Sequence, residues 1–340
     1  MKTRILKVSP LFPEPEKLDE AAEVLRKGGL VAFPTETVYG LGANFQDEAA
    51  VDRVYRVKKR PKDKPLTIHI TSAEQIRAFV DEVPRIGHRL IRKFWPGPLT
   101  LILRSKEGRS VGFRMPSSRI AQDLISKAGV PIVAPSANIS GRPAPKTAEE
   151  VLSDLDGQID MLIDGGPTQI GTESTVVDLS TLPPKVLRRG AIDSAIIFNL
   201  KCVLFVCTGN SCRSPMAEGF LRRKLEELGK DQQVDIFSVG TSPAAGMGAS
   251  PDAIKVMEEE GIDISNHESS PLTDDMIRDA DLIFAMEAYH REVLTRRVPE
   301  SSNKIHVLNV PDPIGKPIEV YRNALALLKK SLPKILEKLS

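Results

Sequence analysis

The sequence predicts an α/β protein of two domains, and three observations support this prediction. Its 340 residues suffice for two domains with sizeable cores, and 41% hydrophobic with 27% charged residues is ordinary for a globular protein. Short apolar runs of strand length alternate with segments in which apolar residues recur at helical spacing. Near residue 200 a helical pattern ends and a new apolar strand begins almost at once. We therefore expect domains at residues 1–199 and 200–340.

Composition gives a general expectation of where the protein works. The net charge of +2 neither indicates nor excludes a nucleic-acid partner. No apolar stretch approaches the length needed to cross a bilayer, and the start MKTRILKVSPLFPEPE lacks the apolar core of a signal peptide. Cys202, Cys207 and Cys212 lie within one short segment, which favours reactive thiols over a disulfide framework. We expect a cytoplasmic protein with no membrane partner, in which Cys212 is either a redox partner of Cys207 or a packing residue.

The first elements lead to a polar loop at a strand end. Apolar residues from Leu18 to Leu25 share one helix face, and Gly28 marks the end of that helix. Residues 30–33 are typical of a buried strand, which runs into PTETVYGLGAN at 34–44. Open α/β sheets bind ligands at the carboxyl edge of their strands, so this segment is placed like a ligand loop. An ordinary polar turn would have the same composition.

A basic segment follows the next helix, which begins near Asp47. RVYRVKKRPKDK, residues 53–64, contains seven Lys or Arg residues, and such runs are usually solvated surface. The following strand LTIHI, residues 66–70, alternates so that His69 is turned toward the same edge as the basic segment. His69 is therefore either a hydrogen-bonded structural residue or part of a ligand site.

The next strands place an arginine among apolar residues. A helix over 86–95 is stopped by Pro96-Gly97-Pro98, and the strand LTLIL is followed by a second strand, SVGFRMP, which contains Arg114. Burying an unpaired guanidinium costs several kcal/mol, so Arg114 needs an anionic partner. A glutamate of the chain or a carboxylate of a substrate would meet that need.

The last strands of this half supply further polar groups. PIVAPS leads into SANISGRPAPKT, residues 136–147, which is again small and polar at a strand end. GTESTVVDLS and KVLRRG complete the strands, with Ser174 and Arg188 available to the same face. There is no internal repeat, no Walker loop and no zinc-ligand spacing, so we expect no metal held by protein side chains.

Together these segments resemble the threonylcarbamoyl-AMP synthase family, the YrdC-like domain, over roughly residues 15–198. The matching motifs are PTETVYGLGAN, KKRPKDKPLTIHI, FWPGPLT, VGFRMP, APSANISGRPAP, GGP and STVVDL. The resemblance implies a twisted, mostly parallel α/β domain with a large positive cavity. It implies that L-threonine, bicarbonate and ATP, with Mg²⁺ on the ATP, give threonylcarbamoyl adenylate and pyrophosphate. Since that product serves tRNA modification, tRNA and the tRNA threonylcarbamoyl transferase machinery are the implied partners.

The resemblance also implies roles for ten residues. Those that would contact threonine are Thr37, His69, Arg114 and Ser174. Those that would hold ATP are Lys58, Arg60, Ser110, Ser136, Asn138 and Arg188. The basic members suit a reaction that gathers several negative charges in one pocket. The alternative for this half is a non-catalytic RNA-binding module whose basic loop contacts phosphates.

The second half opens on KCVLFVCTGNSCRSP, residues 201–215. An apolar strand ends at Cys207, and apolar residues from Met216 recur at helical spacing, so residues 207–213 join a strand to a helix N-terminus. Small loop residues and the helix dipole make an anion cradle there. We expect the same field to lower the pKa of Cys207 and keep it a nucleophilic thiolate. Arg213, at the spacing C-x5-R, can hold two phosphoryl oxygens.

VCTGNSCRSPMAE, followed by SVGTSPAAG, ISNHESSPLTDDMIRDADLIFAME and PDPIG, resembles the low-molecular-weight protein phosphatases. The resemblance implies a parallel-sheet α/β domain and a phosphocysteine intermediate, with Cys207 as nucleophile, Arg213 as clamp and Asp312 as general acid. Asp312 lies between two prolines, in a rigid loop that can hold its carboxyl over a leaving group. The other implied members of the phosphate loop are Thr208, Gly209, Asn210, Ser211, Cys212 and Ser214.

The phosphatase substrate is expected to be a phosphorylated protein. Tyrosine phosphatases of this family tend to carry a bulky aliphatic residue in the place of Ser211 and aromatic residues after the Asp-Pro. Ser211 and the acid loop DPIGKP resemble the bacterial protein-arginine phosphatases more. We therefore expect phosphoarginine ahead of phosphotyrosine, with small-molecule esters left open. An arsenate reductase would use the same cradle, but it needs further cysteines and none follows Cys212.

Overall fold

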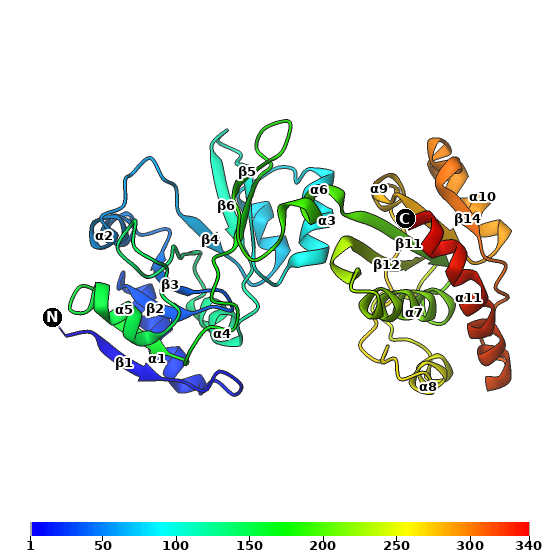
Figure 1. Ribbon diagram of the computed structural model, residues 1–340, viewed down its shortest axis with the longest axis horizontal. Helices are drawn as coiled ribbons and strands as arrows, with labels where there is room; N and C mark the ends of the chain where they lie inside the picture. The colour runs from blue at the N-terminus through cyan, green and yellow to red at the C-terminus, as the bar shows by residue number, and fades with distance from the viewer. Residues whose placement is uncertain (1, 340) are drawn as a thin grey trace. The chain divides into compact units, whose positions relative to one another are not determined.

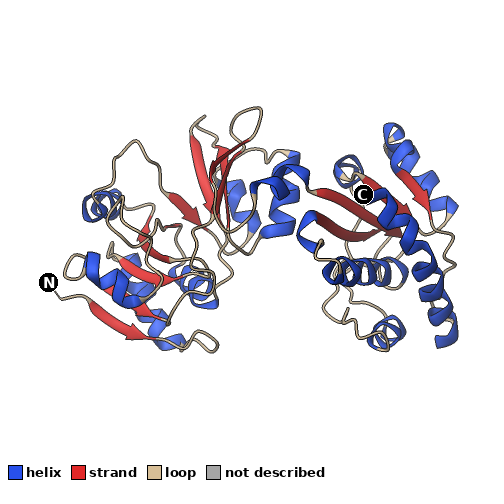
Figure 2. Ribbon diagram, viewed as in Figure 1, coloured by secondary structure: helices blue, strands red, loops and turns tan. Residues whose placement is uncertain are grey.

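The structure is a computed structural model that describes residues 2–339, and the chain divides into two compact units (Figure 1). The N-terminal unit comprises residues 1–198 and the C-terminal unit residues 199–340. Both units combine helices with a sheet (Figure 2). Among the described residues, no helix combines the length and the apolar character that a membrane span requires.

The N-terminal unit is built on one ten-stranded sheet in the order β1-β8-β2-β3-β7-β4-β6-β5-β9-β10. Its strands are β1 Arg4–Lys7, β2 Val31–Pro34, β3 Tyr39–Asn44, β4 Thr67–His69, β5 Leu99–Arg104, β6 Ser110–Arg114, β7 Ile132–Val133, β8 Met161–Asp164, β9 Thr175–Asp178 and β10 Lys185–Arg188. Its helices are α1 Pro15–Arg26, α2 Glu48–Lys58, η1 Ala73–Ala78, α3 Arg85–Phe94, α4 Arg119–Ala128, α5 Ala148–Leu155 and α6 Ser194–Asn199, the last of which reaches the unit boundary.

The sheet is mixed, and the expectation of a mostly parallel sheet is wrong. Only β1/β8, β2/β8, β4/β6 and β5/β9 pair in parallel, while the other five neighbouring pairs are antiparallel. The physical reason lies in the short connections. Residues 35–38 join β2 to β3 and residues 105–109 join β5 to β6, and connections this short can only join antiparallel strands. A family-level description therefore did not give the strand directions.

Helices α1 and α4 cover the β2/β8 region of this sheet. Leu18 and Leu25 of α1 and Ile120 and Leu124 of α4 are buried with Phe33 in one hydrophobic cluster. The spacing of these residues gives each helix one apolar face, which burial against the sheet stabilises. This packing fixes the turn after β2, which contributes to the site described below.

The C-terminal unit has a four-stranded parallel sheet in the order β12-β11-β13-β14. The strands are β11 Lys201–Cys207, β12 Val234–Gly240, β13 Leu282–Ala285 and β14 Ile305–Val307. The helices are α7 Arg213–Glu227, η2 Asp231–Gln233, α8 Pro251–Glu258, α9 Asp274–Asp279, α10 Ala288–Arg297, η3 Pro299–Lys304 and α11 Ile318–Leu339.

Strand β11 has hydrophobic cores on both faces. Val203 and Phe205 pack in a cluster with α7, α8 and α11, whereas Leu204 and Val206 pack in a second cluster with α9 and α10. Side chains that alternate along a strand point to opposite faces, so the continuous apolar run predicts this double burial. The carboxyl end of β11 lies at the switch point of the sheet, where doubly wound folds bind their ligands.

Candidate functional sites

One cavity of the N-terminal unit gathers basic and hydroxyl side chains from distant parts of the chain. Six of the residues predicted to bind threonine or ATP line it together: Arg60, His69, Arg114, Ser136, Ser174 and Arg188. They come from strands β4, β6 and β10 and from the loops after α2, after β7 and before β9. The sheet order explains this convergence, because β4 and β6 are neighbours and β9 pairs with both β5 and β10.

The other four predicted residues lie beside this cavity. The hydroxyl of Thr37 accepts from Arg114 Nη2 at 2.7 Å, which places Thr37 directly behind the guanidinium. Lys58 and Asn138 are linked to Ser136 by hydrogen bonds: Lys58 Nζ donates to the carbonyl oxygen of Asn138, and the hydroxyl of Ser136 donates to Asn138 Oδ1. Ser110 lines an adjoining cavity of about 380 Å³ that shares Pro65 with the first.

The guanidinium of Arg114 has an anionic partner within the chain. Its Nη2 donates to Glu36 Oε1 at 2.7 Å, and the exposed fractions of the two side chains are 6% and 2%. The sequence allowed either a glutamate of the chain or a substrate carboxylate as the anionic partner of Arg114, and the structure shows a glutamate, Glu36. The sequence does not mark Glu36 as a site residue, although Glu36 stands inside the PTET segment at the end of the strand.

His69 is neutral in this cavity. Its Nδ1 lies 3.3 Å from the carbonyl oxygen of Thr67, so Nδ1 carries the proton and Nε2 is left as an acceptor. Burial, followed by the nearby charge of Arg114, lowers the pKa of His69 to about 3. The residue therefore offers hydrogen bonds rather than charge.

Lys58 is buried and holds a loop. Its Nζ donates to the carbonyl oxygens of Ser136 and Asn138, the latter at 2.6 Å, and it lies 3.3 Å from Asn138 Oδ1. Burial lowers the pKa of Lys58 to about 8, so the ammonium is still largely protonated at pH 7. These contacts tether the segment that carries Ser136, and the predicted contact of Lys58 with ATP stays a prediction.

Arg188 closes the other end of the cavity. Its Nη1 donates to Glu173 Oε1 at 2.5 Å, and its Nε and Nη2 donate to the carbonyl and hydroxyl oxygens of Ser174 at 3.0 and 2.9 Å. The side chains of Arg188 and Glu173 are 41% and 36% exposed. This pair is accessible, in contrast to the buried pair of Arg114 and Glu36.

In the C-terminal unit, the loop after β11 wraps around the sulfur of Cys207. The hydroxyl of Ser214 lies 2.9 Å from the Sγ atom, and the backbone N–H of Asn210 donates to it at 3.2 Å. Asn210 has a φ of 51°, a left-handed conformation that asparagine tolerates better than most residues. Its side chain donates to Ser214 and Ser238 and accepts from the N–H of Ser270, which fixes the loop.

Arg213 lies in the same site and is paired with two carboxylates. It forms ion pairs with Glu287 and Asp312, and its Nη1 also donates to the carbonyl oxygen of Val310 at 3.1 Å. A cavity of about 160 Å³ is lined by the three predicted catalytic residues, Cys207, Arg213 and Asp312, with Ile314 and the loop residues Thr208, Gly209, Ser211 and Cys212. The structure thus brings the three predicted catalytic residues together.

The expected lowering of the pKa of Cys207 is not found. Burial raises the pKa of this thiol and outweighs the hydrogen bonds from Ser214 and Asn210 and the charge of Arg213. The loop amides and the arginine do favour the thiolate, but the sulfur is almost completely buried, which the local sequence does not reveal.

Cys212 is buried in the hydrophobic cluster that also contains Val203 and Phe205 of β11. Its Sγ lies 3.1 Å from the hydroxyl of Ser250 and 3.9 Å from that of Tyr321, and all three cysteines are free thiols. These contacts fit the packing role. They do not test the redox role.

A histidine and a tyrosine that we had not singled out support this loop. The hydroxyl of Thr208 contacts the hydroxyl of Tyr289 and lies 3.1 Å from His290 Nε2, while His290 Nδ1 accepts from the N–H of Glu287. Burial and the charge of Arg213 lower the pKa of His290 to about 4, so it is neutral and links Thr208 to Glu287. The available signal was their position in AMEAYH, immediately after the buried strand β13.

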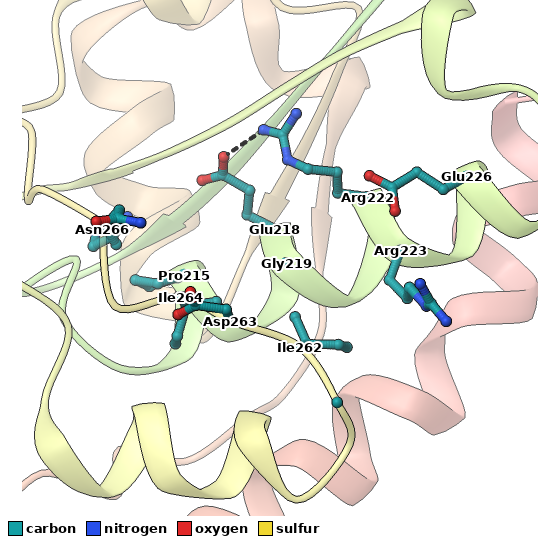
Figure 3. Close-up of a pocket in the computed structure, with 12 residues that line it drawn as sticks. Pro215, Glu218, Gly219, Arg222, Arg223, Glu226, Ile262, Asp263, Ile264 and Asn266 are labelled. Atoms are coloured by element: carbon teal, nitrogen blue, oxygen red, sulfur yellow. Dashed lines mark hydrogen bonds and ion pairs between the residues drawn. The ribbon is translucent and has the colours of Figure 1, made fainter. Parts of the chain in front are cut away.

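A further cavity, of about 310 Å³, lies between α7 and residues 261–267 (Figure 3). Figure 3 shows the side chains of Glu218 and Arg222 paired with each other. Arg222 Nη2 donates to Glu218 Oε1 at 2.8 Å. His267, which also lines it, lies 2.7 Å from the carbonyl oxygen of Asn210. None of the described residues that line this cavity was predicted to be a site residue.

Comparison with known proteins separates the same two regions. Residues 23–190 match the Sua5/YciO/YrdC family, described as telomere recombination. Residues 202–340 match the family described as low molecular weight phosphotyrosine protein phosphatase.

Three relatives illustrate the first match. The threonylcarbamoyl-AMP synthase of Pyrococcus abyssi is 50% identical over 185 residues, which are 52% of this chain and 54% of that protein. A putative threonylcarbamoyl-AMP synthase of Mycobacterium tuberculosis strain H37Rv is 36% identical over 51% of this chain and 84% of its own. A crystal structure of P. abyssi Sua5 complexed with L-threonine is 30% identical, with a TM-score of 0.54 over 97% of this chain and 98% of that one. The chain spans about half the length of the curated threonylcarbamoyl-AMP synthases of P. abyssi and Bacillus subtilis that it matches.

Proposed function

Because the chain belongs to the Sua5/YrdC family and carries a low-molecular-weight phosphatase domain fused to it, we propose that it is a bifunctional enzyme. The N-terminal unit makes threonylcarbamoyl adenylate and pyrophosphate from L-threonine, bicarbonate and ATP. The C-terminal unit is a cysteine-dependent phosphatase. The observation that carries the first activity is the convergence of His69, Arg114 and Arg188 on one cavity.

The threonine end of the cavity is the region around Arg114. A guanidinium can bind a carboxylate through two parallel hydrogen bonds, and Arg114 has donors that its contacts within the chain leave free. Neutral His69 and the hydroxyl of Ser174 lie in the same cavity and can hydrogen-bond the polar groups of an amino acid. P. abyssi Sua5, solved with L-threonine, supports this choice of ligand.

The nucleotide end is the region of Arg60, Ser136 and Arg188. The two arginines supply positive charge for a triphosphate, and Lys58 holds the segment that presents Ser136. The adjoining cavity, which contains Ser110, is also lined by Tyr55 and Phe79, whose rings suit a purine base. ATP therefore spans from one cavity to the other over Pro65.

Mg²⁺ is expected to arrive bound to ATP. No group of three or more His, Cys, Asp or Glu side chains that could hold a metal occurs among residues 2–339. Glu173 is the carboxylate beside the phosphate-binding arginines, so it is the residue of this chain that could complete the coordination. The ion supplies charge neutralisation on the phosphates.

The protein's own contribution is positioning and charge. Carboxylation of the threonine nitrogen by bicarbonate releases water, and attack of the carbamate on the α-phosphate of ATP releases pyrophosphate. Both steps bring anions together, and the arginines reduce their repulsion while holding the reacting groups in contact.

Pyrophosphate release by the purified chain tests this activity. It should require L-threonine, bicarbonate and ATP together. Salt-sensitive RNA binding without pyrophosphate release would favour the rival view of a non-catalytic RNA-binding module. Because the product of this reaction serves tRNA modification, we propose tRNA and the tRNA threonylcarbamoyl transferase machinery as partners and the cytoplasm as the location.

In the C-terminal unit, the sulfur of Cys207 attacks phosphorus and the bond to the leaving group breaks. Asp312 protonates the leaving atom, which gives a phosphocysteine. Water then attacks phosphorus while Asp312 accepts a proton from that water. The phosphorus–sulfur bond breaks, which releases inorganic phosphate and returns Cys207 to the thiolate form. Arg213 and the loop amides hold the three non-bridging oxygens throughout.

Substrate binding supplies the reactive thiolate in this scheme. In the structure Arg213 is shared with Glu287 and Asp312, and the Cys207 thiol has a raised pKa. A bound phosphoryl group replaces Asp312 on the guanidinium. One proton shared between Cys207 and Asp312 can then reside on the carboxyl, which leaves a thiolate nucleophile and a protonated acid.

The preferred substrate is a protein phosphoarginine, ahead of phosphotyrosine. The cavity wall contains the small hydroxyl of Ser211 and the aliphatic Ile314 rather than aromatic rings. Asp312 can also pair with the guanidino group of the substrate and then protonate the leaving nitrogen. Steady-state comparison of phosphoarginine and phosphotyrosine peptides tests the order, and comparable turnover would overturn it. Arsenate-dependent thiol consumption would instead favour the arsenate reductase alternative.

A further inference from the structure

The N-terminal cavity contains a carboxylate whose burial calls for an explanation. Glu36 is 3% exposed and lies in the turn between β2 and β3. Desolvating a carboxylate and a guanidinium opposes folding, and an ion pair of this kind is weak evidence for stability. The placement of Glu36 is therefore better explained by what it does to Arg114.

Three contacts hold Glu36 in one position. Oε1 accepts from Arg114 Nη2 at 2.7 Å, and Oε2 accepts from the backbone N–H of Ser117 at 3.0 Å. The backbone carbonyl of Glu36 accepts from the N–H of Ile170 at 2.8 Å. The carboxylate thus bridges the β2–β3 turn to the segment that follows β6, the strand that ends at Arg114.

The contacts of Arg114 are concentrated on one nitrogen. Nη2 donates to Glu36 and Thr37, both at 2.7 Å, and lies 3.4 Å from the hydroxyl of Thr35. Nε is buried, and within residues 2–339 it has no hydrogen-bond partner. A buried donor without a partner is costly, so an unpaired Nε on a cavity-lining arginine indicates an acceptor supplied by a ligand.

We propose that Glu36 is a positioning residue for amino-acid recognition: it fixes Arg114 by one nitrogen so that the remaining donors face the substrate carboxylate. This inference rests on the proposed threonine site. It predicts that a change of Glu36 weakens recognition of the substrate carboxylate and does not weaken binding of the nucleotide.

The second ion pair of the same cavity provides a matched control. Arg188 and Glu173 have the same chemistry, but all three guanidinium nitrogens of Arg188 are engaged within the chain and the pair is exposed. Glu173→Gln therefore removes the same kind of carboxylate at the nucleotide end.

The test compares L-threonine with L-threoninamide, which lacks the carboxylate, by calorimetric titration of the full chain. The wild type should bind threonine about 10 to 100 times more tightly, the range of a charge-assisted hydrogen bond. Glu36→Gln and Glu36→Asp should reduce that ratio at least about fivefold, since a shorter or neutral side chain cannot keep both contacts. Glu173→Gln should keep the ratio and weaken ATP binding instead.

The outcomes separate this inference from the proposed function. An unchanged ratio in folded Glu36→Asp overturns the inference, as does an equal fall in Glu173→Gln. Glu36→Asp keeps the charge, so it serves as the test if Glu36→Gln fails to fold. In pyrophosphate release, the threonine KM should rise more than kcat falls, whereas a merely structural defect would lower kcat alone. If the wild type shows no threonine-dependent release, the proposed function fails first.

Discussion

The two sites use arginine in opposite ways. Arg114 is paired with Glu36, whose side chain is 2% exposed and bonded to the backbone, so the pair is fixed. Arg213 is paired with Glu287 and Asp312, whose side chains are 35% and 38% exposed. Carboxylates that water can reach lose less when they leave an arginine than one that is fully buried. A fixed arginine is suited to recognising one ligand geometry, whereas an exchangeable arginine would allow substrate binding to be coupled to proton transfer.

The sites also differ in how the chain assembles them. Residues 207–214 supply most of the phosphate site from one continuous segment. The N-terminal cavity needs several strands and loops that are far apart in sequence. Substitutions in one site should therefore lower one activity and spare the other. The size of each loss then measures how strongly that activity depends on one side chain.

The largest effect is expected for Cys207→Ser. A serine hydroxyl is a much poorer nucleophile than a thiolate at neutral pH, so phosphate release should fall by at least about a thousandfold. Threonine-dependent pyrophosphate release should stay near the wild-type rate. Both are measured on the same preparation. Substantial phosphatase activity in the variant would remove Cys207 from the mechanism, and parallel loss of both activities would indicate misfolding.

The next effect concerns Arg213→Lys. Lysine keeps a positive charge but loses the planar fork that holds two phosphoryl oxygens as charge develops in the transition state. We expect kcat for phosphate release to fall by about 100 to 1,000-fold, on the scale of removing one oxyanion donor. Stopped-time assays with a phosphorylated peptide measure it. A change confined to KM would mean that Arg213 binds the ground state only.

The corresponding change in the other unit, Arg114→Lys, should be milder. The ammonium can still pair with Glu36, but it cannot bind a carboxylate through two nitrogens at the same time. The threonine KM for pyrophosphate release should rise about 10 to 100-fold, with the ATP KM nearly unchanged. Phosphatase activity is the internal control. Equal loss of affinity for both substrates would contradict a division of the cavity into two ends.

The contrast between the sites also explains what the sequence could predict. The predicted catalytic residues Cys207 and Arg213 belong to one strand–loop–helix segment, so spacing and apolar pattern were enough to place them together. The N-terminal cavity residues converge only through sheet pairing such as β4 with β6, which local pattern does not encode. The resemblance supplied them instead, and it missed the strand directions.

The side chains that contact the site residues from distant parts of the chain were the least predictable from the sequence. Glu36, Glu287 and His290 each contact a site residue more than 70 positions away in the chain. No periodicity in the sequence predicts these contacts. The prediction for the pKa of Cys207 was wrong for a related reason, because the direction of the shift depends on how deeply the folded domain buries the sulfur.

The smallest effect tests that last point directly. Since the pKa of Cys207 is raised, the thiolate fraction should increase about tenfold per pH unit below it. The rate of Cys207 alkylation by iodoacetamide, followed by mass spectrometry, should therefore rise from pH 7 to pH 9 without a plateau. Asp312→Asn removes one negative charge beside Arg213, so it should lower the pKa of Cys207 and speed alkylation at neutral pH by about 3 to 10-fold, equivalent to half to one pKa unit. A wild-type plateau near pH 6, with no effect of Asp312→Asn, would show instead that the loop amides and helix dipole dominate the sulfur.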